Sequence, residues 1–465
     1  MIFQLTWKYR PVTTLWRKMS TSILTPPAAV RGMKELDKSL FVKDIQVPCL
    51  YIPADSFRIP DVRYTIKQYL MRIKRFISTV QDSEEEKRLV LNPDTVQEWD
   101  SLEAKHRTFL ESKGISRESL RKESVTLNYD SWGAHEIISA ILGDSAPSVS
   151  GFSRVGHIIH LNLRDEHEPY KRLIGAILLE KTPNARSVIN KSSNIESEFR
   201  NINYELLAGE SDLVAVSKEN GCTFHVDYAH VYWNPRLSSE HERLVKDLQP
   251  DTILYDIFAG IGPFAIPAGK KGCTVLANDL NPASYQWLQK NIAVNNVSHN
   301  VVPYNMDARE FIKTVVKEDM LKRYANDPGA DLRFAMNLPA CADEFLNEFN
   351  GLLHGHEFQE HVHRPPTVCL YCFEKDTDPL TPAGRVRRNL GYSLDESKIS
   401  QRIVRQVAPN KFMLMLQFRV PFEVLMRPPG LVHLLMDNAV EESGTSEQNA
   451  HESDHVGTKR RRLHS

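Results

Sequence analysis

The chain has 465 residues, of which 41% are hydrophobic, and its 58 Lys and Arg nearly balance its 59 Asp and Glu. A net charge of −1 excludes a uniformly basic nucleic-acid binder, so any nucleic-acid surface must be a local patch. The length predicts about three domains, the apolar runs are too short to span a bilayer, and six scattered cysteines favour a reducing compartment over a disulfide framework.

Both ends of the chain are expected to lie outside the folded core. The arm of residues 1–35 is basic, with six Lys and Arg and no Asp or Glu through position 34, which is typical of a mitochondrial transit peptide; a disordered basic arm is the alternative. Residues 436–465 are predicted to be a disordered tail, which closes on the basic run 459–462, a nuclear address or a solvated charge run. We therefore expect the protein in the mitochondrial matrix, the nucleus and the cytoplasm.

The first two folded parts are expected at 36–145 and 146–228. In the first, an α+β module, runs at 49–54 and 125–129 predict strands, while the helical spacing of 66–77 and the charged stretch from 83 predict helices. The second reads as a small β-rich domain, in which turn residues separate strand-like segments at 156–163, 174–181, 186–191, 204–210 and 222–234.

The part at 229–435 alternates strands with helices. A helix is predicted over 282–293, and strands are predicted at 252–258, 274–279, 300–307, 332–339, 367–374 and 411–420. Such alternation predicts an α/β, Rossmann-like domain in which a parallel sheet carries helices on both faces.

A glycine-rich turn follows the first strand of this domain. Gly260 and Gly262 lie in DIFAGIGPF (256–264), which departs from GxGxxG, so a nucleoside site is favoured over a pyrophosphate site, and a plain strand–helix turn is the alternative. Three successive strands end in acids, at Asp256, Asp279 and Asp307. Asp279, 19 residues after Gly260, is placed to bind ribose hydroxyls, while Asp307 suits either adenine recognition or a helix N-cap.

The fourth strand ends in Asn337-Leu338-Pro339-Ala340, at the edge of the sheet where ligands bind. Amino-group methyltransferases of this fold carry Asn-Pro-Pro-Tyr-like sequences at this position. Leucine in second place favours a ring nitrogen as the methyl acceptor, and a helix cap is the alternative reading of the asparagine.

These motifs together resemble one family. YDIFAGIGPFAIPA, NDLNP, MNLPACADEFL and VYWNPRLSSEHERL (231–244) are similar to the tRNA (guanine-37 N1)-methyltransferases of eukaryotes and archaea, closely over about 135–435 and loosely before that. The resemblance implies a class I S-adenosylmethionine-dependent enzyme. Its reaction would methylate N1 of guanosine 37, 3′ of the anticodon of tRNA, which is also the first step toward wybutosine in tRNA-Phe.

The resemblance also implies roles for individual residues. Glu240 would take the N1 proton, Arg200 would face guanine O6, and Tyr232 would hold a flipped base. The alternatives are a first-turn helix acid for Glu240, a phosphate contact or surface ion pair for Arg200, and a core-edge position for Tyr232. Asn337 would contact both the base and the methyl donor. The residues implied for the donor are His241, Asp256, Gly260, Gly262, Asp279, Leu280, Asp307, Ala308 and Asn337.

The expected partner is tRNA, through its anticodon stem-loop and body, and we expect a monomer without a metal. Neither CLYC (369–372) nor the histidine-rich run at 354–363 completes a zinc pattern. Phosphate contacts are expected from basic residues at Arg154, Arg164, Lys171, Arg172, Lys181, Arg186, Lys191, Arg385, Arg387 and Arg388. The alternatives for function are an aminocarboxypropyl transferase of the wybutosine pathway and a non-catalytic tRNA-binding protein.

Overall fold

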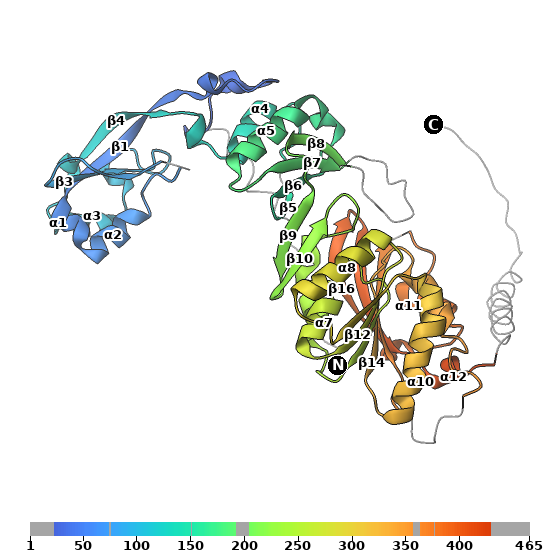
Figure 1. Cartoon of the computed structure of the whole chain (residues 1–465). Coiled ribbons are helices and arrows are strands. Elements are labelled where there is room, and N and C mark those ends of the chain that lie inside the picture. Colours follow the sequence, from blue (N-terminus) through green and yellow to red (C-terminus); the bar gives the residue numbers. More distant parts are fainter. Residues whose placement is uncertain are drawn as a thin grey trace, which may run out of the picture. The chain divides into compact units, whose positions relative to one another are not determined.

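The computed structural model (Figure 1) describes six stretches of the chain, 23–73, 76–149, 151–191, 204–356, 363–375 and 377–428. Residues 1–22 of the predicted arm, Arg200 and the predicted tail lie outside the described residues. The described residues form two compact units. One comprises the residues up to 191 together with 204–212, and the other comprises those from 213 onward.

The first sheet of the first unit is built around one long strand, β1 (Lys43–Pro53). It lies between β3 (Glu86–Val90) and β4 (Leu120–Leu127), both antiparallel to it, and β2 (Thr79–Gln81) extends the β3 edge. Alternate β1 residues enter two separate cores, because successive side chains of a strand point to opposite faces. The helices of this part are α1 (Ala54–Arg58), α2 (Pro60–Lys67) and α3 (Ala104–Glu111).

The two helices predicted in this part, over 66–77 and from 83, are not found, apart from the overlap of the first with the end of α2. The α2 helix ends at Lys67, Leu70 bridges Leu91, and the Met71 N–H donates to the Val90 carbonyl at 2.9 Å. The charged stretch from 83 contains strand β3 instead of a helix. Pairing with strands distant in sequence decided the local conformation in both stretches, which periodicity within a short window does not report.

The second sheet of this unit has the order β5-β6-β7-β8, with β6 (Ile158–Leu161) parallel to β7 (Ser187–Lys191). Its outer strands are β5 (Ser153–Val155) and β8 (Tyr204–Gly209). The helices of this part are α4 (Ala134–Leu142) and α5 (Lys171–Lys181). The strand predicted at 174–181 is therefore wrong. A helix buried on most of its surface has a near-continuous apolar sequence, and periodicity alone does not separate it from a buried strand.

The second unit contains a seven-stranded sheet of order β13-β12-β11-β14-β15-β17-β16. The first five strands in this order run parallel to one another, and β17 pairs antiparallel with β15 on one side and with β16 on the other. Their bounds are β11 Ile253–Asp256, β12 Thr274–Asn278, β13 Val301–Tyr304, β14 Leu332–Met336, β15 Thr367–Lys375, β16 Ser400–Ala408 and β17 Lys411–Arg419. The Rossmann-like fold predicted from the sequence is confirmed, whereas β16 was not predicted.

Helices cover both faces of this sheet, with α7 and α8 on one face and α10 and α11 on the other (Figure 1). The bounds are α6 Ser238–Lys246, α7 Ala265–Lys271, α8 Pro282–Val294, α9 Ala308–Phe311, α10 Lys317–Asn326, α11 Pro382–Leu390 and α12 Phe422–Leu425. The helix predicted over 282–293 is confirmed as α8. No helix within the described stretches is long and apolar enough to cross a membrane.

A hairpin of β9 (Val214–Glu219) and β10 (Cys222–Asp227) belongs to the second unit, where Asn291 of α8 and Asn295, which caps the end of that helix, hold it by hydrogen bonds. The Asn291 amide accepts from the His225 N–H at 2.8 Å and donates to the His225 carbonyl at 3.1 Å. Asn295 does the same with Thr223, at 2.9 and 2.7 Å. Side-chain amides thereby satisfy backbone groups of β10 that no third strand pairs, and they fix the hairpin against α8.

Candidate active site

The register of the parallel strands brings several of the predicted site residues to one edge. Asp256 is level with Ala277 of β12 and Ala335 of β14. Asp279 and Asn337 each follow the last residue of their strands, at the carboxyl edge of the sheet. Ligands of open α/β sheets bind at this edge, so the sheet itself assembles these residues from distant parts of the sequence.

The glycine turn has two different structural demands. Gly260 has a φ of 55°, and a Cβ atom built on it would meet nothing within 4 Å. Gly262 has a φ of 98°, and a Cβ atom there would lie 2.7 Å from Cδ1 of Ile266 and 2.8 Å from Cδ1 of Leu288. The second glycine is required for packing of the turn, while the first leaves its backbone open to close approach by a ligand.

Asp279 ties this turn to the next strand. Its Oδ2 accepts a hydrogen bond from the Gly260 N–H at 2.8 Å, and its Oδ1 accepts from the Asn281 N–H at 2.9 Å. Burial raises the pKa of Asp279, and these amide donors oppose that rise. Each carboxylate oxygen has a second lone pair, so the group can still accept from the hydroxyl groups of a ribose.

Asp256 is fully buried beneath this edge. Neither of its carboxyl oxygens has a hydrogen-bond partner of good geometry among the described residues. The nearby Ala265 backbone amide lowers the pKa of Asp256, but by less than burial raises it. Burial first, and then the neighbouring Asp279 carboxylate, raises the pKa of Asp256 to about 8. Asp256 therefore keeps its proton near neutrality.

Two further predicted donor-binding residues begin α9. Asp307 is its N-cap, since its Oδ1 accepts from the Arg309 N–H at 2.8 Å, and Ala308 is buried in the core of that face. The N-cap reading of Asp307 is therefore confirmed, and the other lone pairs of its carboxylate remain for a ligand. Leu280 is exposed beside Asp279.

Asn337 carries an unsatisfied group at the carboxyl edge. Its Oδ1 is buried, yet it has no hydrogen-bond partner among the described residues. Leaving a buried amide oxygen unpaired costs roughly 1–3 kcal/mol. An unpaired acceptor at the same sheet edge as the open backbone of Gly260 fits a ligand that supplies hydrogen-bond donors, as the amino groups of a nucleoside or of a methionine moiety do.

Glu240 lies in the first turn of α6, with its side chain only 5% exposed. Its Oε1 accepts a hydrogen bond of 2.8 Å from the Tyr371 hydroxyl and also forms an ion pair with Arg402. Leu370 of β15 (Thr367–Lys375) is level with Met336 of β14. The next residue, Tyr371, is therefore level with Asn337 at the carboxyl edge. The predicted proton acceptor therefore lies at the same edge as the predicted donor site.

His241 and its neighbours form an aromatic layer beside Glu240. The His241 ring meets Phe264 edge-on at 4.9 Å, and Phe264 stacks on Tyr371 at 5.8 Å. The His241 Nδ1 lies 2.5 Å from Oε1 of Glu219, on strand β9. This short contact between two buried side chains ties the hairpin to the segment that carries Glu240.

Tyr232 is 54% exposed, and its hydroxyl accepts from the Asn234 amide at 3.4 Å. An exposed aromatic ring a few residues before α6 is free to stack on a base, which fits the predicted role and disagrees with a core-edge position. Arg200 lies outside the described residues, so its predicted contact with guanine O6 stays a prediction.

Sequence reasoning missed four residues that hold the site together, namely Glu219, Phe264, Tyr371 and Arg402. Tyr371 lies within CLYC, where the cysteine spacing is the more conspicuous feature, and Arg402 lies on β16, a strand that the sequence pattern does not predict. The alternation of β15 does separate Cys369 from Cys372, which enters the core of the opposite face with Val368 and Leu370. A tyrosine inside a buried apolar run was the one available signal, because a buried hydroxyl needs a partner.

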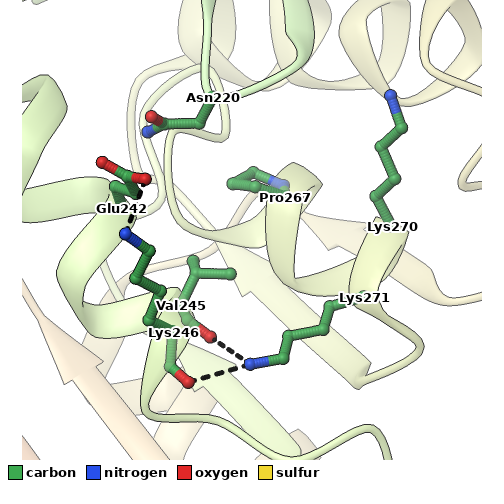
Figure 2. Close-up of a pocket in the computed structure, with 7 residues that line it drawn as sticks. All are labelled: Asn220, Glu242, Val245, Lys246, Pro267, Lys270 and Lys271. Atoms are coloured by element: carbon green, nitrogen blue, oxygen red, sulfur yellow. Dashed lines mark hydrogen bonds and ion pairs between the residues drawn. The ribbon is translucent and has the colours of Figure 1, made fainter.

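A separate open hollow of about 360 Å³ lies between α6 and α7 (Figure 2). Its lining residues are Asn220, Glu242, Val245, Lys246, Pro267, Lys270 and Lys271. Two of these lysines make hydrogen bonds to backbone carbonyls within the chain. Lys271 donates to the Val245 and Lys246 carbonyls at 2.9 Å each. Lys270 donates to the Gly221 carbonyl at 2.7 Å. None of the predicted site residues lines this hollow, which lies at the far end of α7 from the glycine turn.

Several of the basic residues predicted to contact RNA are instead paired within the chain. Lys181 is buried and donates to the Tyr129 carbonyl at 2.7 Å, so the prediction is wrong for this residue. Arg385 pairs with Asp343 at 2.8 Å in a largely enclosed position. Arg154 and Arg164 are exposed, as an RNA contact requires. Among the described residues, no group of three side chains has an arrangement that could hold a metal ion.

Comparisons with known proteins bear directly on this site. Residues 215–367 match the model of the TRM5/TYW2 methyltransferase domain, and residues 135–212 match that of the TYW2 N-terminal domain. A tRNA (guanine(37)-N(1))-methyltransferase of Drosophila melanogaster is 41% identical over 416 residues, which is 88% of this chain and 90% of that protein. The chain belongs to the tRNA (guanine(37)-N(1))-methyltransferase family. The human member is 38% identical over 413 residues, covering 88% of this chain and 80% of its own length.

Solved structures agree with this family in fold. Trm5b from Pyrococcus abyssi matches with a TM-score of 0.53 at 24% identity, over 81% of this chain and 99% of that one. A structure of aTrm5 in complex with tRNALeu matches with a TM-score of 0.55 at 24% identity, over 80% of this chain and 99% of that one. These two likenesses show that the chain shares its fold with Trm5b and aTrm5.

Proposed function

We propose that this protein transfers a methyl group from S-adenosylmethionine to N1 of guanosine 37 in tRNA. The observation that carries the proposal is the position of Glu240, a buried carboxylate at the same sheet edge as Gly260, Asp279 and Asn337. The names of the relatives at about 40% identity support the same substrate and the same position on it.

The residues present fit the donor. The open backbone at Gly260 allows a nucleoside to approach closely, Asp279 offers acceptors for its ribose hydroxyls, and the orphaned Asn337 oxygen offers one for an amino group. When bound, S-adenosylmethionine supplies a methyl group on a positively charged sulfur, which is open to attack by a nucleophilic nitrogen. His241 and Phe264 would close the side of the site next to α6.

The chemistry at guanine requires a proton acceptor, because N1 of a neutral guanine carries a hydrogen and has no free lone pair in the ring plane. Glu240 would accept that proton, and the exposed ring of Tyr232 would stack on the base once it has left the anticodon stack. Arg200 would donate to guanine O6 as charge moves onto the carbonyl. Action as a monomer is part of this proposal.

Primer extension across the anticodon loop tests the function. Unmodified tRNA with guanosine at 37, treated with protein and S-adenosylmethionine, is expected to gain a stop at that base, because a methyl on N1 blocks pairing. A donor labelled in the methyl carbon should label the RNA, whereas label in the aminocarboxypropyl carbons should not. Label in those carbons would instead establish the aminocarboxypropyl transferase, and donor binding without transfer of either label would establish a non-catalytic protein.

A further inference from the structure

One row of residues runs across the antiparallel side of the second-unit sheet. Met415 of β17 is paired in register with Tyr371 of β15 on one side and with Arg402 of β16 on the other. Residues paired directly across strands point to the same face, and neighbouring strands lie about 4.8 Å apart, so Tyr371 and Arg402 stand on one face about 10 Å apart. Glu240 of α6 lies over this row and reaches both side chains.

The two side chains bind the same carboxylate oxygen. Oε1 of Glu240 receives the Tyr371 hydroxyl at 2.8 Å and the Arg402 guanidinium. The other oxygen, Oε2, faces Arg243 Nε at 4.0 Å, which is beyond hydrogen-bond distance, and no hydrogen bond to it is found among the described residues. The carboxylate is thus held on one oxygen and free on the other.

We propose that Arg402 and Tyr371 are positioning residues for proton abstraction, which fix Oε1 of Glu240 and leave Oε2 to accept the proton of guanine N1. This inference rests on the proposed function. In the step it describes, the N1–H bond breaks, its proton forms a bond to Oε2, and the electron pair stays on N1 for attack on the methyl carbon. Arg402 and Tyr371 take no part in bond making.

Two physical effects make these residues necessary. The Arg402 guanidinium lies against a carboxylate that is only 5% exposed, and it offsets the cost of burying that group. The terminal torsion of a glutamate is also soft, and two donors on one oxygen fix the plane of the carboxylate. Tyr371 remains a donor throughout, because burial and the Glu240 charge raise its pKa well above the ordinary value.

The titratable groups that face Glu240 among the described residues come from three elements. They are Arg243 on its own helix, Tyr371 and Cys369 on β15, and Arg402 on β16. Burial raises the pKa of Cys369 to about 12, and the Glu240 charge adds to that rise, so Cys369 stays a neutral thiol. Arg402 has a side chain only 25% exposed, so solvent weakens its pairing less than it would weaken a surface pair. Its neighbour along β16, Arg405, bonds only the adjacent Gln406 carbonyl, at 3.5 Å, among the contacts of the described residues.

The test measures single-turnover methylation of tRNA across pH for Arg402→Gln, Arg402→Lys and Tyr371→Phe, with Arg405→Gln as the matched control. Arg402→Gln should slow the reaction about tenfold or more near neutral pH, move the rising limb of the pH–rate profile to higher pH, and leave the dissociation constant of S-adenosylmethionine unchanged. Arg402→Lys should restore part of the rate, because it restores the charge without the planar guanidinium that directs its N–H at Oε1. Tyr371→Phe should shift the profile in the same direction by less, and Arg405→Gln should match the wild type.

Two further measurements separate positioning from a structural role. Added guanidinium ions should partly rescue Arg402→Ala, while the same concentration of sodium chloride should not. Combining Arg402→Gln with Glu240→Gln should cost no more than Glu240→Gln alone, since Arg402 acts through that carboxylate. A wild-type pH profile in Arg402→Gln, or an equal loss at every pH with no guanidinium rescue, would overturn the inference. A wild-type protein that leaves guanosine 37 unmethylated would instead overturn the proposed function.

Discussion

The carboxylate of Asp279 accepts a 2.8 Å hydrogen bond from the backbone N–H of Gly260, which joins the carboxyl ends of β11 and β12. One side chain therefore has two tasks. It holds the glycine turn in its open conformation, and it offers acceptors at the place where the ribose of the donor is expected. The first task can be measured without substrate, and the second needs the donor.

Asp279→Asn is expected to weaken S-adenosylmethionine binding about 10- to 100-fold. An amide has one acceptor oxygen where the carboxylate has two, so either the Gly260 or the Asn281 N–H loses its partner, and a hydrogen bond to a charged group contributes roughly 1.5–3 kcal/mol. Isothermal titration calorimetry measures the change. Asp327→Asn is the control, because Asp327 accepts from the Gly329 N–H at 2.9 Å in a turn outside the site. Equal affinities for Asp279→Asn and wild type would show that the donor binds elsewhere.

The two glycines of the turn are expected to respond differently to alanine. Gly262→Ala should lower the thermal unfolding temperature of the protein with or without donor, because the new methyl would lie 2.7 Å from Ile266 Cδ1 and the φ of 98° disfavours any side chain. Gly260→Ala meets no protein atom, so it should cost only about 1 kcal/mol of backbone strain. Its methyl would occupy the space over the turn, and the stabilisation that added donor gives should therefore fall. Undiminished stabilisation by donor in Gly260→Ala would argue against donor contact at this turn.

The parallel part of the second unit could be predicted from the sequence because its strands are buried apolar runs bounded by polar turns, as 252–258 and 274–279 are. The carboxyl-edge residues followed from that prediction, since strand direction alone places Asp279 and Asn337 together. The helices predicted at 66–77 and from 83 were wrong, because strand pairing in β3 outweighed local periodicity.

The partners of Glu240 were out of reach for a different reason. Tyr371 is 131 residues from Glu240 in the chain, and Arg402 is 162 residues away. Strand β16, which carries Arg402, is polar along most of its length and lies at the sheet edge, so it has little of the apolar signal by which a strand is recognised. Which basic residue meets which buried carboxylate depends on the register of three antiparallel strands, and a single sequence does not report that register.

Asp256 is expected to make stability depend on pH in a defined direction. Its pKa is about 8 in the folded protein, whereas the ordinary value, which applies to the unfolded chain, is 3.8. Between these two values the folded state holds a proton that the unfolded state has released. The contribution of Asp256 to the free energy of unfolding is therefore most favourable below about pH 4, and it falls as the pH rises toward about 8. Asp256→Asn cannot ionise, so its unfolding temperature should exceed that of the wild type by an amount that grows across this window. Parallel pH dependences of the two proteins would show that Asp256 is ionised in the fold.

Glu240→Gln is expected to lower the single-turnover methylation rate about 10²- to 10⁴-fold, the range found when a positioned general base is removed. The glutamine oxygen can still accept from the Tyr371 hydroxyl, but its amide cannot take the N1 proton. Donor and tRNA affinities should stay close to those of the wild type, which binding titrations check together with the fold. Glu242→Gln is the matched control, since Glu242 lies on the same helix and pairs only with Lys246, at 2.9 Å, among the described contacts. A variant that keeps the wild-type rate at every pH would remove Glu240 as the proton acceptor, because no step that needs a carboxylate at this position would then limit the reaction.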